Sequence, residues 1–326
     1  MPIQKGAKKM DLSRRSFFGA AGLAAAGSIV PSVASAAKVP RGATSFMFGP
    51  KNKIRIRIPD LKENVRVLIV GDTHFNLHDE RDNEYKDMYK RMAGSTDPTK
   101  PFAETLNYAK KAKVDLILLV GDNLSFPTLA NVEYFKRELD ACGIDWYYVA
   151  GNHDWHFEGS PGSDEEQRDI WIEKRLKPLY KGLNPLMSSR LIKGIRFVAI
   201  DNSIYHVTQK QLDFWKQEAA KGDPMVLFMH IPFWQEGWES VFTCGNPKWG
   251  AATDPYWEIE RREKWAEKQM PSTFEFRDAV LSTPNLAGVM TGHHHTRYVS
   301  SEKGAFLFTV PDNRKGHFYD VTFTAQ

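Results

Sequence analysis

Five apolar runs of this chain stop at short segments rich in aspartate, asparagine and histidine. The runs end in GDTH at 71–74, GDN at 121–123, GNHD at 151–154, His230 and GHHH at 292–295. Runs rich in Val, Ile and Leu are typical of strands in a sheet that is covered on both faces. Because ligands of open α/β sheets bind outside the carboxyl ends of the strands, we expect these five segments to lie close together.

Helical spacing separates several of these runs. Residues 102–112 and 130–142 have it, and a further helix is expected near 208–220. Strands alternating with helices predict an α/β fold with a parallel or mixed sheet covered on both faces. The runs 305–310 and 317–323 leave no room for a helix between them, which predicts an antiparallel pair at the end of the sheet.

The first 36 residues are typical of an export signal rather than of folded structure. Basic residues precede a short apolar run, and the segment ends in Ala34-Ser35-Ala36, so we expect cleavage after Ala36. The pair Arg14-Arg15 in SRRSFF resembles a twin-arginine signal, which implies passage through that export machinery and a periplasmic or secreted protein. The apolar run is too short to act as a stable membrane anchor after signal cleavage.

The remaining chain is expected to form one catalytic domain at 65–326. Residues 37–64 are interpreted as a linker and an N-terminal edge strand, KIRIRI at 53–58. An aromatic insertion at 233–275 interrupts the domain. Long loops of this kind are usually functional, and its tryptophans fit either a small satellite core or the wall of a pocket.

Charge and cysteine content exclude several classes of protein. The net charge is +4, but residues 1–36 carry five Lys or Arg against one Asp, so the remainder is close to neutral. This balance predicts neither a nucleic-acid surface nor a polybasic membrane patch. The two cysteines, Cys142 and Cys244, are expected to be unpaired thiols, and their spacing does not suit a cysteine zinc site.

The polar residues at the strand ends form a chemically distinctive set of donors. Imidazole nitrogens combined with carboxylate and amide oxygens, without thiolates, suit manganese, iron or zinc and argue against calcium. Their number exceeds the needs of one ion and fits two ions that share a carboxylate. Two ions about 3.5 to 4 Å apart are a known device for displacement at phosphorus.

The order of these segments resembles the calcineurin-like metallophosphoesterase family. The blocks D-x-H, GD, GNHD, an isolated histidine and GHxH occur in sequence across residues 65–325. The resemblance implies a mixed β-sheet sandwich flanked by helices, a four-layer fold, with the active site at the carboxyl ends of the strands. It also implies two divalent or trivalent metal ions, either Mn, Fe or Zn.

The resemblance assigns roles at the matching positions. One ion would be bound by Asp72, His74, Asp122 and His295, and the other by Asp122, Asn152, His230 and His293. His153 would face the leaving oxygen of the substrate, and Asp154 could orient His153. His294 occupies the variable position of GHxH, and alternation along an extended segment directs its side chain away from the ligands.

The activity implied is hydrolysis of small phosphomonoesters or phosphodiesters by a hydroxide that bridges the two ions. Ser125 stands where purple acid phosphatases carry tyrosine and where serine/threonine protein phosphatases carry aspartate, which argues against both subfamilies. The alternative is a non-catalytic metal- or ligand-binding protein on the same fold. Retention of His153 favours the enzyme, and the absence of H-E-x-x-H argues against a zinc peptidase.

Other polar residues lie outside these five motifs. Asp201-Asn202 ends the strand FVAIDNS, and we interpret it as an ordinary turn with asparagine or aspartate hydrogen bonds, although a role in the active site stays open. The histidines without a motif are expected to be surface or supporting residues. They are His78, His156, His206 and His317.

Overall fold

The computed structural model describes residues 42–43, 45–49, 52–92, 96–233 and 270–325. All of them belong to one unit, Val39–Gln326. The predicted signal, most of the aromatic insertion and Cys244 lie outside the described residues. Within them Cys142 is a buried free thiol, and no helix has the length and apolar character needed to cross a membrane.

The described strands form two mixed six-stranded sheets. The first has the order β1-β2-β12-β3-β4-β5 and the second β10-β11-β9-β8-β7-β6. The strands of the first sheet are β1 (Ser45–Phe48), β2 (Lys53–Arg57), β3 (Val65–Val70), β4 (Leu116–Val120), β5 (Trp146–Val149) and β12 (Tyr319–Thr324). Those of the second are β6 (Met187–Ile192), β7 (Ile195–Ile200), β8 (Met225–Phe228), β9 (Leu286–Thr291), β10 (Tyr298–Glu302) and β11 (Ala305–Thr309).

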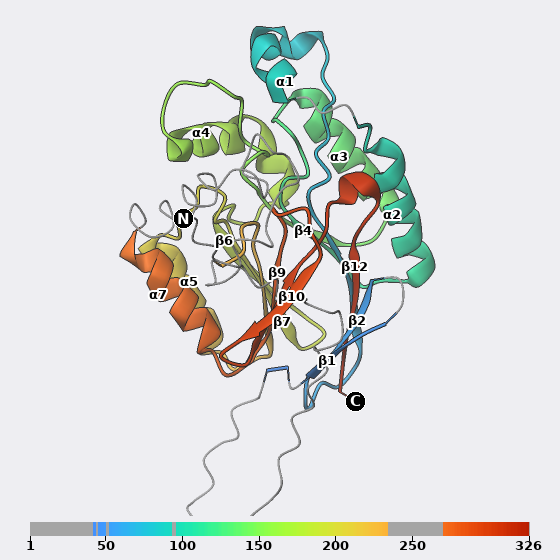
Figure 1. The fold of residues 1–326 in the computed structure, drawn as a ribbon, viewed down its shortest axis with the longest axis vertical. Coiled ribbons are helices and arrows are strands. Elements are labelled where there is room, and N and C mark those ends of the chain that lie inside the picture. Colours follow the sequence, from blue (N-terminus) through green and yellow to red (C-terminus); the bar gives the residue numbers. More distant parts are fainter. Residues whose placement is uncertain (1–41, 44, 50–51, 93–95, 234–269, 326) are drawn as a thin grey trace, which may run out of the picture. The chain divides into compact units, whose positions relative to one another are not determined.

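The sheets pack face to face, and helices cover their outer faces (Figure 1). Helices α2 (Thr99–Ala112) and α3 (Leu129–Cys142) pack on the first sheet, and α5 (Gln209–Ala219) and α7 (Pro271–Leu281) pack on the second. The expected mixed β-sheet sandwich flanked by helices is therefore confirmed. The remaining helical segments are η1 (Glu80–Tyr85), α1 (Lys86–Met92), α4 (Asp164–Trp171), η2 (Ile172–Leu176), η3 (Lys177–Tyr180) and η5 (Asn313–Lys315).

Strand β3 shows why the apolar runs are continuous. Val67 and Ile69 point into the core between the sheets, whereas Leu68 and Val70 point into the core beneath the helices. Successive side chains of a strand face opposite ways, so a strand covered on both faces needs apolar residues at every position. Each of these fully buried side chains contributes about 1.5 to 3 kcal/mol.

Side-chain caps define where two of the covering helices begin. The Thr128 side chain accepts from the Asn131 amide at the start of α3, which ends at Gly143 with a φ of 74°. Thr208 and Gln211 form a reciprocal capping box at the start of α5. Such caps satisfy backbone amides that the first helical turn leaves without partners.

Two expectations about the strands were wrong. The stretch interpreted as a linker contains β1, which occupies the sheet edge, so KIRIRI lies second from that edge. The runs 305–310 and 317–323 do not pair, because η5 carries the chain from one sheet to the other between them. β11 pairs with β9 and β10, whereas β12 runs antiparallel to β3 and parallel to β2.

Candidate metal centre

Six of the seven predicted ligands form two groups at the carboxyl ends of the strands. Within each group, donor atoms of all members lie within 4.8 Å of one another. The first group follows β3 and β9, and the second follows β4, β8 and β9. The groups are Asp72, His74 and His295, and Asp122, His230 and His293.

The backbone at these residues adopts a conformation that side chains normally avoid. Twelve non-glycine residues among those described have positive φ, and five of them belong to the two donor groups. They are Asp72, His74, Asp122, His293 and His295, with φ between 50° and 75°. A left-handed conformation costs of order 1 to 3 kcal/mol per residue and persists only where the surroundings enforce it.

Backbone hydrogen bonds enforce this geometry on the first two loops. The Asp72 amide donates to the Gly121 carbonyl, and the His74 amide donates to the Asp122 carbonyl, each at 3.0 Å. The loops after β3 and β4 therefore continue the pairing of their strands. They bring Asp72 and Asp122 to the same edge of the sheet.

Glycine allows the loops to approach each other. A Cβ added at Gly121, whose φ is 89°, would lie 2.6 Å from the Gly151 nitrogen and 2.7 Å from His230 Nδ1. A Cβ at Gly151 would lie 2.2 Å from Asp122 Oδ1. Real Cβ atoms do not come this close, so the glycines that precede the polar residues are needed for convergence.

Asp122 lies between the two groups. Its Oδ2 is 3.1 Å from His230 Nε2 and 3.9 Å from His74 Nε2, while its Oδ1 accepts from the His153 amide at 2.8 Å. One carboxylate thus faces an imidazole of each group. This is the arrangement expected of a ligand shared by two ions.

Imidazole nitrogens also face each other within each group. His74 Nε2 and His295 Nε2 are 3.0 Å apart, and His293 Nδ1 is 3.2 Å from His230 Nε2. His230 Nδ1 lies 2.8 Å from the Val120 carbonyl, which suits an N–H there and directs Nε2 toward the centre. Facing lone pairs need a shared proton or a cation.

Burial and mutual charge set the pKa values of this centre. Burial lowers the pKa of His74 well below its ordinary value. Burial also lowers the pKa of His230, but the Asp122 carboxylate outweighs this effect and raises it to about 9. Burial raises the pKa of Asp122, but His230 and His153 outweigh it and hold that pKa far below its usual range. A buried Asp122 carboxylate therefore depends on neighbouring positive charge.

Asn152 provides an oxygen beside these groups. Its Oδ1 is buried and accepts no hydrogen bond from any described residue. The next residue, His153, is bound through its amide to Asp122, so Asn152 stands at the margin of the centre. A buried amide oxygen without a donor fits a metal ligand, because leaving it unsatisfied would cost about 1 to 3 kcal/mol.

His153 lies next to the first group. Its ring centroid is 4.9 Å from that of His74, in an edge-to-face arrangement, and burial lowers the pKa of His153. Asp154 does not orient it. The two oxygens of Asp154 accept from the amides of Leu124 and Gly151, each at 2.7 Å, so this carboxylate joins the loops after β4 and β5.

Two buried asparagines support the ligand loops, a role that was not predicted from the sequence. Asn202 accepts from the amides of His230 and Ile231 and donates to the Ile231 carbonyl at 2.7 Å. Asn131 donates to Phe75 and accepts from Leu77, on the loop that carries His74. For Asn202 a signal existed, since it follows an apolar run as the ligand segments do.

The remaining histidines lie outside both donor groups. His294 neighbours His293 without joining either group of described residues. His78 stacks on Tyr89 with ring centroids 4.5 Å apart, and His317 Nδ1 is 3.6 Å from Asp312.

A family model described as calcineurin-like phosphoesterase matches residues 65–297. The chain belongs to this family. It is therefore a hydrolase of phosphoric ester bonds, and the family resemblance expected from the ordered motifs is confirmed. No curated protein compared with the chain matches it.

Solved structures of three phosphoesterases share distant similarity with the chain. A dimetal phosphatase from Danio rerio has 12% identity and a TM-score of 0.46, over 80% of this chain and 99% of that one. A purple acid phosphatase from seeds of yellow lupin (Lupinus luteus) has 13% identity and a TM-score of 0.46, over 81% and 46%. A phosphopantetheinyl hydrolase from Mycobacterium tuberculosis has 10% identity and a TM-score of 0.44, over 79% and 96%. The family assignment comes from the sequence match, to which these likenesses add nothing.

The donors of this phosphoesterase fit the metal ions on which its family typically depends. Each group offers a carboxylate and two imidazoles, Asp122 faces both groups, and the Asn152 oxygen lacks a donor. Such mixed nitrogen and oxygen sets suit Mn, Fe or Zn. The residues present are therefore suitable for two ions.

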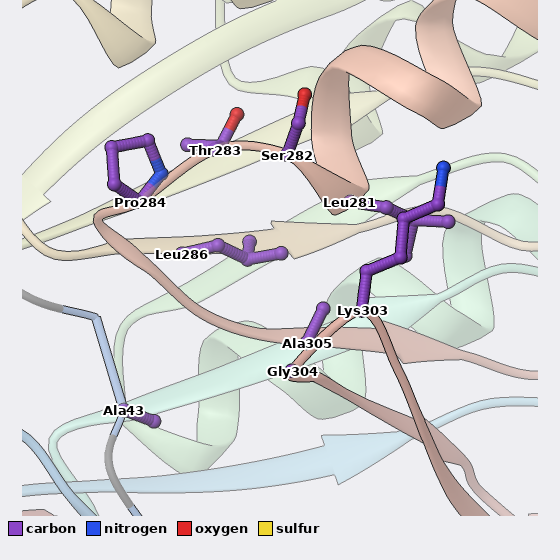
Figure 2. A pocket seen from close by; sticks show the side chains of 9 residues that line it. All are labelled: Ala43, Leu281, Ser282, Thr283, Pro284, Leu286, Lys303, Gly304 and Ala305. Atoms are coloured by element: carbon purple, nitrogen blue, oxygen red, sulfur yellow. The ribbon is translucent and has the colours of Figure 1, made fainter.

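A hollow of the phosphoesterase lies at the strand ends opposite to the donor groups (Figure 2). It has a volume of about 290 Å³ and is bordered by Leu286 at the start of β9, whereas His293 follows the end of that strand. The hydroxyls of Ser282 and Thr283 donate to carbonyls of the last turn of α7. These side chains complete the helix end, and the hollow takes no part in the centre.

Proposed function

We propose that the protein is an exported hydrolase that uses two metal ions, Mn, Fe or Zn, to cleave small phosphomonoesters or phosphodiesters. The observation that carries this proposal is the position of Asp122, whose Oδ2 faces His230 in one donor group and His74 in the other. Asp72, His74, Asp122 and His295 would bind one ion, and Asp122, Asn152, His230 and His293 the other.

Bound ions would supply electrostatic stabilisation of the phosphoryl oxygens and would lower the pKa of the attacking water. The residues of the chain position this chemistry. The Val120 carbonyl holds the His230 ring, and the amide of His293 donates to both oxygens of Asp72 at 2.9 and 3.1 Å. These contacts orient the donors in advance, so little reorganisation is needed when substrate binds.

His153 is proposed to assist departure of the alcohol. Its ring adjoins His74 of the first donor group, and the proposal places the ester oxygen beside one of its nitrogens. A proton from that imidazole nitrogen would neutralise the leaving alkoxide. General acid catalysis of this kind contributes about 10² to 10⁴-fold.

The test compares two histidine variants with aryl phosphate and bis-aryl phosphate as substrates. His153→Ala is expected to lower kcat by about 10² to 10⁴-fold while elemental analysis still finds two ions per chain. His294→Ala is the matched control, since this residue lies outside both groups, and it should keep both activity and metal. Metal-loaded protein that hydrolyses neither ester would refute the proposed function.

Export is proposed from the sequence of residues 1–36, which lie outside the described residues. Replacement of Arg14 and Arg15 by lysine should leave the protein in the cytoplasm with its signal uncleaved. Efficient export of that variant would contradict the twin-arginine route. A cleaved N-terminus at Ala37 in the exported protein would support it.

A further inference from the structure

Lysine and arginine are rare at the sheet edge that carries the donor groups. The described loops that follow β3, β4, β5, β7 and β8 at this edge contain neither residue. These loops are 71–79, 121–128, 150–163, 201–208 and 229–233. The cations of the two remaining loops are Arg297, after β9, and Arg314 and Lys315, in η5 after β11. Among the described loops, recognition of an anionic substrate by Lys or Arg therefore depends on these two.

The η5 segment is attached directly to the loop that carries the first donor group. The Asn313 amide donates to the Gly71 carbonyl at 2.9 Å, and the Arg314 amide donates to the Asp72 carbonyl at 3.2 Å. The Asn313 side chain donates to the Thr105 hydroxyl at 2.9 Å, which holds η5 against α2. The backbone of Arg314 is therefore fixed beside a proposed metal ligand.

The Arg314 side chain is partly buried and makes one weak contact with the described residues. Its exposed fraction is 28%, and its guanidinium donates to Asp312 Oδ2 at 3.5 Å. Lys315, which is 61% exposed, lies closer to the same oxygen, at 3.2 Å. No other carboxylate of the described residues pairs with either cation. One Asp312 charge thus faces two permanent positive charges, and most donors of the guanidinium remain available to a ligand.

The charge of Arg314 acts on the first donor group. Burial lowers the pKa of His74, and the positive charge of Arg314 acts in the same direction. Such an influence requires a short distance or an interior that screens charge poorly. Arg297 instead lies over the Tyr319 ring, with its guanidinium carbon 5.8 Å from the ring centroid. Of the three cations at this edge, Arg314 is therefore the one placed to contact a substrate at the centre.

The donor groups by themselves suit the phosphoryl group that would be transferred. They contain two carboxylates, Asp72 and Asp122, so two divalent ions would leave a net charge of about +2. A phosphate monoester carries about two negative charges at neutral pH. The centre would therefore neutralise the ester phosphate, and the Arg314 charge would be in excess unless the substrate brought a further anion.

We propose that Arg314 binds a second anionic group, a phosphate or a carboxylate, on the alcohol part of the substrate. This inference rests on the proposed function and narrows its substrate class to phosphate esters with a further anion. A guanidinium donates two parallel hydrogen bonds to either anion, so it recognises both the charge and the orientation of the group. The contact lies on a part of the substrate that does not react, so it contributes to binding rather than to the chemical step.

Phosphonates test binding without turnover, because they contain no ester bond. The ligands are propylphosphonate, with one anionic group, 4-phosphonobutyrate, which adds a carboxylate, and propane-1,3-bisphosphonate, which adds a second phosphonate. Calorimetric titration of the metal-loaded wild type should give the doubly anionic ligands a Kd about 10 to 100-fold below that of propylphosphonate. Arg314→Gln should remove this difference and keep the Kd of propylphosphonate within about threefold.

The corresponding esters provide a kinetic measurement. They are propyl phosphate, 3-carboxypropyl phosphate and 1,3-propanediol bisphosphate. Arg314→Gln should raise KM for the two doubly anionic esters about 10 to 100-fold with little change in kcat, because substrate and transition state share the lost contact. Arg314→Lys keeps the charge without the two parallel donors, so its KM values should lie between those of the wild type and Arg314→Gln. The doubly anionic ester with the larger loss identifies the group that Arg314 binds.

Lys315→Gln is the matched control. It removes an equal charge one residue away from a largely exposed side chain, so every constant should stay within about threefold of the wild type. Equal melting temperatures would show that the variants fold.

Three outcomes would overturn the proposal. They are a wild type that binds singly and doubly anionic phosphonates equally, an Arg314→Gln variant that loses all three ligands equally, and a Lys315→Gln variant with similar losses. The second outcome would place Arg314 on the transferred phosphoryl group, and the third would indicate a diffuse field instead of a contact. The proposed function is judged separately, by hydrolysis of aryl phosphate and bis-aryl phosphate by the wild type.

Discussion

At the scale of single residues, Asn202 shows how one buried amide holds a ligand loop. Its Oδ1 accepts from the amides of His230 and Ile231 at 3.2 and 3.0 Å, and its Nδ2 donates to the Ile231 carbonyl. These bonds join the loop after β7 to the loop after β8. The left-handed backbone at Asp72 and Asp122 is held in a comparable way, by bonds between neighbouring loops.

Asn202→Ala is expected to weaken metal binding at the group that contains His230. Loss of three hydrogen bonds frees the His230 backbone, so one of two ions should bind about 10 to 100-fold more weakly. Calorimetric titration of the metal-free protein measures the two affinities separately.

Asn285→Ala is the matched control. Asn285 is also buried and donates to the Asp223 carbonyl, but at the opposite end of β8. The Asn285→Ala variant should be less stable than the wild type but should bind metal with the same affinity. Equal metal binding in Asn202→Ala and the wild type would contradict a positioning role for Asn202.

At the scale of elements, one carboxylate connects a helix with two strands. Asp320 of β12 binds Arg66 of β3 and the Tyr108 hydroxyl of α2. Arg66 further donates to the Ala112 carbonyl at the end of α2 at 2.7 Å. This network fixes the helix against the strand that leads to Asp72.

The network makes stability depend on pH. Burial raises the pKa of Asp320, but Arg66 and Tyr108 outweigh it and hold that pKa below its ordinary value. A carboxyl with a lowered pKa stabilises the fold above its unfolded pKa of about 3.9 and loses this contribution as pH falls through the folded value. Asp320→Asn should therefore cost about 2 kcal/mol at neutral pH, and less below about pH 4.

Urea unfolding of both proteins across this pH range measures the difference. Asp79→Asn serves as control, because Asp79 pairs with Arg81 at the exposed surface and its loss should leave stability unchanged. A difference between wild type and Asp320→Asn that stays constant down to acid pH would show that the Asp320 charge is not responsible.

At the scale of the whole unit, the donor groups join the two sheets. Asp72 and Asp122 follow strands of the first sheet, whereas His230 and His293 follow strands of the second. Ions bound by all of them would connect the sheets at their carboxyl ends. Metal binding and folding stability should therefore be linked.

Removal of metal is expected to lower the melting temperature. At a free ion concentration 100 times Kd, one ion stabilises the fold by about 2.7 kcal/mol, so a chelator should lower Tm by roughly 5 to 10 °C. Scanning calorimetry with and without chelator measures this change. Asp122→Ala should melt near the chelated wild type and respond little to chelator; an unchanged wild-type Tm would argue against ions that bridge the sheets.

Much of the fold and of the candidate site can be predicted from local sequence. Continuous apolar runs specify strands covered on both faces, since every position of a strand such as β3 meets a core. Glycine followed by Asp, Asn or His marks their carboxyl ends, and parallel strands bring those ends to one edge. These two regularities depend on residue type and spacing alone, so the α/β class, the family and the candidate ligands could be predicted.

Only the tertiary structure decided which strands pair and what the supporting side chains do. The separation of β11 and β12 into different sheets depends on η5, whose path has no signal in the apolar pattern. Asp154 accepts from the Leu124 amide and Asn202 donates to the Ile231 carbonyl, and both of these backbone groups belong to other loops. Hydrogen bonds and charge pairs between residues far apart in sequence form only once the chain has folded, so residue spacing does not encode them.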